Sequence, residues 1–279
     1  MIPPEEAGMQ AAPTGLERAP EPPPRGLWAQ LGGAALGVAR AGGRGASAAY
    51  QAVDPDLRWH LAQLPLLGLT LLGPRRETVE PRPDDGRRPV VFVHGLGGHR
   101  GNFLPMRLWL RARGRRRLYA CGLEPGQGVE AQARQLSAYL EEVVRVNGLA
   151  DGAQVDLVAH SMGGLVARCA LEDPATARRV STLVTLGTPH GGSHAARYLA
   201  TRDLLALRPD SPLMARLAAR TPWVGPPRLV CFWSRADVLL LPAATATVPG
   251  AENHELEGVT HYGYLLRADC WRRVLHSLS

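Results

Sequence analysis

The chain has 279 residues and a hydrophobic fraction of 45%, so it is long enough for one large packed domain or two small ones. Its formal net charge is +7, and because the sequence contains no lysine, all 32 basic residues are arginines. This charge is compatible with contact to acidic surfaces, but no recognition motif accompanies it, and we do not expect nucleic-acid binding.

The first 88 residues differ in composition from the rest of the chain. Residues 1–26 hold seven prolines and no early apolar core, which predicts a disordered tail and not a signal peptide. Residues 27–88 form a predicted extension, in which the apolar segments Leu27–Val53 and Leu61–Leu72 precede a polar, proline-rich linker. We expect these two apolar segments to pack on the domain as extra helices. The alternative is that they form a peripheral membrane anchor. The predicted location of the protein is the cytoplasm.

The four cysteines are far apart, and no pair has the spacing of metal ligands. They are Cys121, Cys169, Cys231 and Cys270. Each lies among apolar residues, so we expect free buried thiols in preference to disulfides. The histidines show no H-E-x-x-H spacing either, and the sequence predicts no metal site.

From Pro89 onward, apolar strand-like runs alternate with helical periodicity. The predicted strands are Val90–Val93, Arg116–Cys121, Gln154–Val158, Val180–Leu186, Arg228–Trp233 and a short Glu255–Val259. The predicted helices are Asn102–Arg113, Glu130–Val146, Met162–Leu171 and Tyr262–Leu278. This alternation predicts an α/β domain over 89–279, with a mostly parallel sheet and helices on both faces. Functional residues of such folds gather at the carboxyl ends of the strands.

Ser161 stands at the joint between a predicted strand and a predicted helix, in the sequence AHSMG. A serine in such a tight turn projects its hydroxyl above the sheet. The residues two before and two after it are expected to crowd each other across the turn, so both must be small, and here they are Ala159 and Gly163. The pentapeptide alone is equally compatible with a serine that caps the helix.

A nucleophilic serine needs a base and an acid that orients the base. Asp237 follows the predicted strand Arg228–Trp233, and His261 follows the last predicted strand, so both come after the serine in the order that this arrangement requires. Glu252 and Glu255 are rival candidates for the acid. The ordered set of three residues favours Ser161 as the nucleophile.

Two backbone N–H groups are needed to stabilise the oxyanion of acyl transfer. Met162, directly after the serine, supplies one, and Leu96 in the glycine-rich loop HGLGG, residues 94–98, is our choice for the second. In that loop His94 is expected to orient the backbone, and Gly95 and Gly97 allow it to approach the substrate.

Two other histidines are predicted to form the site wall. His160 adjoins the serine on the turn and is expected to be a wall or orienting residue. His190 follows a strand end and is expected to line the pocket, but it precedes the acid in the chain and is disfavoured as the base.

Five blocks of the sequence occur in the order found in lipases and esterases of the α/β-hydrolase family: VVFVHGLGGHRGNF, VDLVAHSMGGLVAR, TLVTLGTPHGGS, WSRADVLLLP and LEGVTHYGYLL. The chain resembles in particular the small bacterial triacylglycerol lipases with an A-H-S-M-G turn. The resemblance implies a catalytic triad of Ser161, Asp237 and His261, carboxylic-ester substrates such as acyl glycerols, and no cofactor. It covers about Pro89 to Ser279.

Residues 194–226 exceed a simple connection and resemble the cap or lid segments of larger lipases. The same machinery also serves thioesterases, acyltransferases and amidases, which remain alternatives. A protein of this fold that binds lipid without catalysis is a further alternative, although all three triad residues are present.

Overall fold

The computed structural model describes residue 63, residues 78–198 and residues 201–278. The predicted tail, 1–26, lies outside these residues. So does the predicted extension, 27–88, apart from residue 63 and the segment 78–88. Within the described residues, no helix is both long and apolar enough to cross a membrane. All four cysteines are free and buried, as predicted.

Six strands form one sheet that is parallel throughout, in the order β2-β1-β3-β4-β5-β6. They are β1 (Val90–Val93), β2 (Leu118–Cys121), β3 (Val155–His160), β4 (Val180–Leu186), β5 (Arg228–Trp233) and β6 (Glu252–Glu255). The first three strands of the chain are buried at every position, which is expected of a parallel sheet covered on both faces.

The order of the strands reverses beside β1. The next strand, β2, pairs with one edge of β1, and β3 pairs with the other edge. The connections therefore leave β1 and β3 toward opposite sides, and such a switch point opens a crevice at the carboxyl ends of the two strands. The loop 94–98 and Ser161 follow these two ends, so the topology brings them together.

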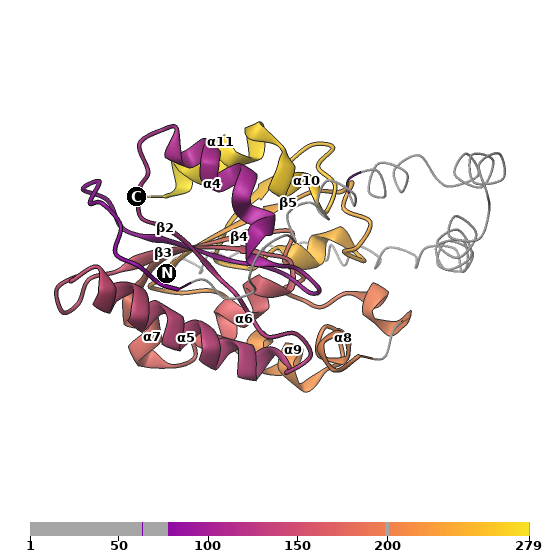
Figure 1. The fold of residues 1–279 in the computed structure, drawn as a ribbon. Coiled ribbons are helices and arrows are strands. Elements are labelled where there is room, and N and C mark those ends of the chain that lie inside the picture. The colour runs from indigo at the N-terminus through magenta and orange to yellow at the C-terminus, as the bar shows by residue number, and fades with distance from the viewer. Residues whose placement is uncertain (1–62, 64–77, 199–200, 279) are drawn as a thin grey trace, which may run out of the picture.

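Helices cover the two faces of the sheet, α5, α6, α7 and α9 on one and α4, α10 and α11 on the other (Figure 1). Strand residues alternate between the two cores, so that Val91 and Val93 pack with α5 and α6 while Val90 and Phe92 pack with α4 and α11. The α-helices are α4 (Leu104–Arg111), α5 (Val129–Val146), α6 (Met162–Ala170), α7 (Pro174–Arg179), α8 (Arg202–Ala206), α9 (Pro212–Ala218), α10 (Gly263–Leu266) and α11 (Ala268–Ser277). Three short 3-10 helices are η1 (Arg100–Phe103), η2 (His194–Tyr198) and η3 (Ala243–Ala246).

Two predicted elements near the C-terminus are wrong. The last strand is Glu252–Glu255 and not Glu255–Val259, because its side chains are all exposed and only backbone pairing with β5 defines it. The predicted helix Tyr262–Leu278 is two helices, α10 and α11, since Arg267 between them has an extended backbone (φ −100°, ψ 127°).

Helix α7, like α8 and α9 in the cap segment, was not predicted as a helix. Asp173 caps it by accepting hydrogen bonds from the N–H groups of Ala175 and Thr176, and Pro174 is its first residue. The sequence Asp-Pro is a known start signal, and it could have revealed this helix.

The segment predicted as a cap, 194–226, contains η2, α8 and α9. Arginines fix α9 to the helices beneath it: Arg168 of α6 donates to the Leu217 carbonyl at 2.8 Å, and Arg220 donates to the Leu171 carbonyl at 3.2 Å. Helix α8 is held by Asp203, which is buried and accepts hydrogen bonds from the N–H groups of Gly126 and Gly128, each at 3.0 Å.

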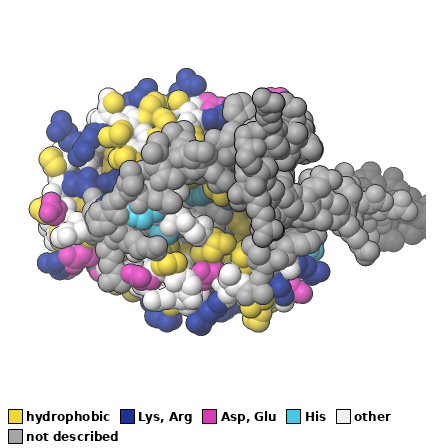
Figure 2. Space-filling model, turned by 45° about the vertical axis from the view of Figure 1, so that its right-hand side comes forward, with side chains coloured by type: hydrophobic (Ala, Val, Ile, Leu, Met, Phe, Trp, Pro, Cys, Tyr) yellow, Lys and Arg dark blue, Asp and Glu magenta, His cyan; other side chains and the backbone are white. Residues whose placement is uncertain are grey.

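The paired helices α4 and α11 carry a surface in which apolar and basic side chains are mixed. Leu104 and Leu108 are 47% and 56% exposed, and the rings of Trp109 and Trp271 meet edge to face at 6.0 Å. Residues 98–117 include seven arginines and no carboxylate, and all of these arginines except Arg115 and Arg117 are at least partly exposed. Figure 2 shows hydrophobic and arginine side chains interspersed over the upper part of the molecule, where these helices lie in Figure 1.

Replacing Asp203 tests whether the cap segment depends on this carboxylate. We expect Asp203→Ala to lower the free energy of unfolding by about 2–4 kcal/mol, because two N–H groups lose their acceptor in a buried place. The control is Asp210→Ala, in the same segment, whose carboxylate is exposed and forms only a surface ion pair with Arg197. Urea denaturation gives the unfolding midpoint of each variant. Equal midpoints would show that Asp203 contributes no more to stability than the exposed Asp210.

Candidate active site

Ser161 links the end of β3 to the start of α6 in a strained backbone conformation. Its φ and ψ are 54° and −131°, and it is the one described residue other than glycine with a positive φ. Such a conformation costs about 1–3 kcal/mol and persists only where the surroundings enforce it. Although Ser161 occupies the N-cap position, its side chain makes no capping hydrogen bond. The capping interpretation is therefore wrong, and the hydroxyl is available for another contact.

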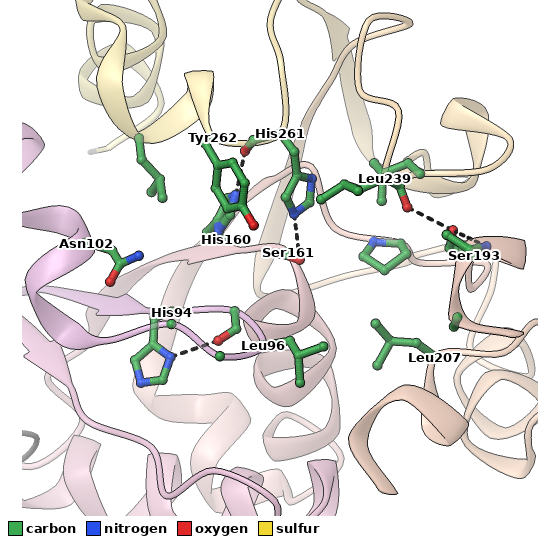
Figure 3. A pocket seen from close by; sticks show the side chains of 18 of the residues that line it. His94, Leu96, Asn102, His160, Ser161, Ser193, Leu207, Leu239, His261 and Tyr262 are labelled. Carbon is green, nitrogen blue, oxygen red and sulfur yellow. Dashed lines mark hydrogen bonds between the residues drawn. The ribbon is translucent and has the colours of Figure 1, made fainter. Parts of the chain in front are cut away.

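The hydroxyl of Ser161 instead meets His261. Its Oγ lies 2.9 Å from His261 Nε2, and His261 Nδ1 lies 2.8 Å from Asp237 Oδ2. All three side chains are buried. Because the carboxylate accepts from Nδ1–H, Nε2 is left to accept the serine proton. The structure thus brings together the three residues that the sequence predicts as a triad (Figure 3, in which Ser161 and His261 are labelled).

The rival carboxylates are not near the histidine ring. Glu252 and Glu255 are exposed on β6, where Glu252 pairs with Arg228 at 2.6 Å and Glu255 pairs with Arg235 at 2.8 Å. Asp237 has its position fixed from the other side as well, since its Oδ1 accepts the N–H of Leu239 at 3.2 Å.

Two positions close to Ser161, Gly95 and Gly163, have no room for a side chain. A Cβ at Gly95 would lie 2.7 Å from the Cβ of Ser161, and one at Gly163 would lie 2.5 Å from the carbonyl oxygen of Val93. The crowding at position 163 is therefore against the end of β1, and not mainly against Ala159 as the sequence argument supposed. An alanine at position 159 fits because it is a buried strand residue that does not face this contact.

The predicted oxyanion donors flank the serine. Met162 is the first residue of α6, so its N–H has no acceptor within the helix. Leu96 lines the cavity directly after Gly95, whose backbone packs against Ser161 (Figure 3). The neighbouring Gly97 has a φ of +62°, a conformation that favours glycine. The N–H groups of Leu96 and Met162 remain the predicted donors to the oxyanion.

The ring of His94 is held in one tautomer and orients the loop 94–98. The Leu123 N–H donates to His94 Nε2 at 3.1 Å, so the proton is on Nδ1, which lies 3.0 Å from the Gly95 carbonyl and donates to it. The side chain therefore orients the backbone next to the nucleophile, as expected from the sequence.

His160 supports the base. Its Nε2 donates to the backbone carbonyl of His261 at 2.8 Å, and the centroids of the two rings are 4.7 Å apart. Burial, reinforced by the nearby His261, lowers the pKa of His160 well below its usual value, so that its ring is neutral at neutral pH. A neutral ring at this place adds no charge that would oppose the charged form of His261.

His190 does not line the cavity, contrary to the prediction. It is buried behind the wall, where Nδ1 lies 3.4 Å from Arg168 Nη1 and Nε2 lies 3.1 Å from Thr185 Oγ1. Burial and the charge of Arg168 lower the pKa of His190 well below its usual value. Its position excludes it as the base for Ser161, because both of its ring nitrogens face Arg168 and Thr185 while His261 contacts the serine hydroxyl.

A cavity of about 400 Å³ opens above Ser161. Its wall is mainly apolar, and the cap segment and the loop after β5 contribute Leu204, Leu207 and Leu239 to it. Asn102 and Tyr262 also line it (Figure 3), and the sequence analysis did not identify either of them as site residues. The position of Tyr262 next to His261 was the only signal in the sequence, whereas nothing distinguished Asn102 or the leucines.

Comparison with known proteins supports this assignment of the fold. Residues 124–203 match the model of a PGAP1-like alpha/beta domain. The mature form of a lipase from Bacillus licheniformis superposes with a TM-score of 0.60 at 20% identity, covering 73% of this chain and 98% of that structure. The chain therefore has the α/β-hydrolase fold, and this prediction is confirmed.

Curated relatives are similar to this chain over its hydrolase region. A triacylglycerol lipase from Burkholderia plantarii is 30% identical over 162 residues, which are 54% of this chain and 43% of that protein. A triacylglycerol lipase from Pseudarthrobacter phenanthrenivorans is 30% identical over 131 residues, 44% of this chain and 39% of that protein. The predicted similarity to bacterial triacylglycerol lipases is thus confirmed, although the matched regions span less than half the length of these relatives.

The contact between Gly95 and Ser161 can be tested by adding one methyl group. We expect Gly95→Ala to reduce turnover of a chromogenic ester by about 100-fold or more, because the serine must move from its position beside His261. The matched control is Gly191→Ala, where the added Cβ meets only ordinary contacts at 3.6–3.8 Å. Retention of full activity by Gly95→Ala would contradict the close packing of Gly95 against Ser161.

Proposed function

We propose that the chain is a serine hydrolase that cleaves carboxylic esters of lipids through an acyl-enzyme intermediate. The observation that carries this proposal is the continuous set of contacts from Ser161 Oγ through His261 to Asp237, at 2.9 and 2.8 Å. A hydroxyl, an imidazole and a buried carboxylate in this order are the groups that acyl transfer requires.

In the first step His261 accepts the proton of Ser161 as the oxygen attacks the ester carbonyl. The oxyanion accepts hydrogen bonds from the N–H groups of Leu96 and Met162. His261 then gives its proton to the leaving alcohol, and Asp237 stabilises the charged ring throughout. Water attacks the acyl-enzyme with His261 again as the base, and His261 returns this proton to Ser161 Oγ as the bond to the acyl carbon breaks and the carboxylic acid leaves.

The apolar wall of the cavity favours a lipid acyl group. Leu204, Leu207 and Leu239 offer an acyl chain a surface without hydrogen-bonding side chains, and burial of each methylene contributes about 0.8 kcal/mol. Similarity to proteins named triacylglycerol lipases supports the same substrate class.

Replacement of the nucleophile tests the proposal directly. We expect Ser161→Ala to abolish ester hydrolysis and labelling by a fluorophosphonate probe while the unfolding midpoint changes little. The control is Ser181→Ala, on β4 and away from the cavity. Undiminished hydrolysis by Ser161→Ala would refute the proposal. Labelling of the wild type with turnover of thioesters or amides, but not of esters, would favour the alternative acyl-transfer activities.

The second part of the proposal is peripheral contact with a membrane of anionic lipids through the surface of α4 and α11. Exposed Leu104 and Leu108 offer apolar insertion, and the arginines around them, without a carboxylate on α4, complement a negative surface. Helix α4 directly follows Phe103, which lines the cavity, so contact at this surface brings the cavity close to the lipid.

Co-sedimentation with vesicles measures this contact. We expect binding of the full chain to vesicles of phosphatidylcholine and phosphatidylglycerol, and Leu108→Glu should weaken it about tenfold because it removes apolar burial and adds repulsion. The control is Val224→Glu, which alters a residue that is 84% exposed elsewhere on the molecule. Equal binding by both variants would place the membrane contact on another part of the chain.

A further inference from the structure

The cavity above Ser161 has two walls of different chemistry. One wall, from the cap segment and the loop after β5, is formed mainly by leucine and alanine side chains. On the other side, where Phe103 and Leu265 also line the cavity, Asn102 of η1 and Tyr262 beside His261 turn polar groups toward the space near Ser161 (Figure 3). An ester has two sides as well, the acyl chain and the alcohol.

The geometry points to an alcohol-binding subsite formed by Asn102 and Tyr262, which takes an uncharged polyol such as the glycerol of a monoacylglycerol. This inference rests on the proposed ester hydrolysis and deepens it, because it names the class of alcohol that the site accepts.

The side on which the alcohol leaves is set by the base. His261 must give its proton to the leaving oxygen, so the alcohol lies on the side of the cavity next to His261. Tyr262 follows His261 in the chain, and its ring stands edge-on to the His261 ring with centroids 5.5 Å apart. Because Tyr262 lines the cavity on this side, its hydroxyl is the group that would meet the other hydroxyl groups of a polyol.

Tyr262 is suited to act as a hydrogen-bond donor. Burial, with a smaller contribution from Asp237, raises the pKa of its hydroxyl, so the group stays protonated at neutral pH. Within the described part of the chain this hydroxyl bonds to no other residue, although Tyr119 and Tyr139 do form such bonds. A ligand hydroxyl in the cavity would supply the missing partner.

Asn102 presents its amide nitrogen in a fixed direction. Its Oδ1 accepts the N–H of His99 at 2.9 Å, and this bond determines which end of the amide is the oxygen. The nitrogen is therefore the end that faces the cavity, as Figure 3 shows. Because the side chain is buried and held at the start of η1, it is a preorganised donor and loses little freedom when a ligand binds.

The charge of the cavity selects among polar alcohols. Among the described residues that line it there is no arginine, aspartate or glutamate. A phosphate-bearing head group would therefore lose its hydration without gaining a cation. Hydroxyl groups can exchange their bonds to water for bonds to Asn102 and Tyr262, so a neutral polyol fits better than a phosphodiester.

Substrate pairs with one acyl chain test the subsite. The full-length protein is assayed with a monoacylglycerol and with the methyl ester of the same fatty acid, and the ratio of their kcat/KM values is compared among variants. We expect the wild type to prefer the monoacylglycerol and Tyr262→Phe to lower the ratio about fivefold, the value of one hydrogen bond. Asn102→Ala should lower the ratio as well, and its unfolding midpoint reports separately the loss of the bond to His99.

The control is Tyr264→Phe, whose hydroxyl is buried two residues further along and bonds to nothing in the described residues, so its ratio should equal that of the wild type. An unchanged ratio in Tyr262→Phe, including one that results from an equal fall in both kcat/KM values, would overturn the subsite. So would a wild-type preference for a lysophospholipid with the same chain. Failure of the wild type to hydrolyse any of these esters would instead refute the proposed function.

Discussion

The strained backbone of Ser161 is the constraint on which the rest of the site depends. It is enforced from several directions: the Ser161 N–H donates to the Leu186 carbonyl at 2.9 Å, and the Ser161 carbonyl accepts from Thr188 Oγ1 at 2.8 Å. Helix α6 also approaches β1 so closely that only glycine fits at position 163. These contacts belong to neighbouring strands and loops, so the energy that holds the serine in place comes from the assembled sheet.

The site buries several polar side chains and satisfies them individually. His94 and His160 are both neutral donors to backbone carbonyls, and Asp237 is the carboxylate that faces His261. Fixing neutral rings around one acid–base pair limits the charge in the site to the groups that change during acyl transfer. Such preorganised dipoles stabilise developing charge without rearrangement during the reaction.

The cap segment gives the cavity its chemical asymmetry. Buried Asp203 fixes α8 to the loop before α5, and arginines fix α9 to α6, so the leucines above Ser161 are carried on anchored helices. Opposite them, Asn102 and Tyr262 come from segments on the other face of the sheet. The inferred specificity for the alcohol of the ester therefore arises where the apolar wall of the cap segment meets the wall that contains Asn102 and Tyr262.

The sequence by itself determined the parallel α/β architecture and the order of its elements, because strand hydrophobicity and helical periodicity are local properties. It also indicated Ser161, Asp237 and His261, since each follows a strand end in a fixed order along the chain. It misplaced β6, whose exposed side chains carry no hydrophobic pattern, and it assigned His190 to the cavity although that residue packs against Arg168.

Only the tertiary structure decided which side chains share the cavity. Asn102, Leu204 and Tyr262 are distant in sequence and have no common pattern, and they meet because the sheet, the cap and the last loop converge above one serine. The structure also decided between a capping and a nucleophilic serine. That distinction rests on the direction of a single hydroxyl, which is set by contacts across the fold and not by its neighbours in the chain.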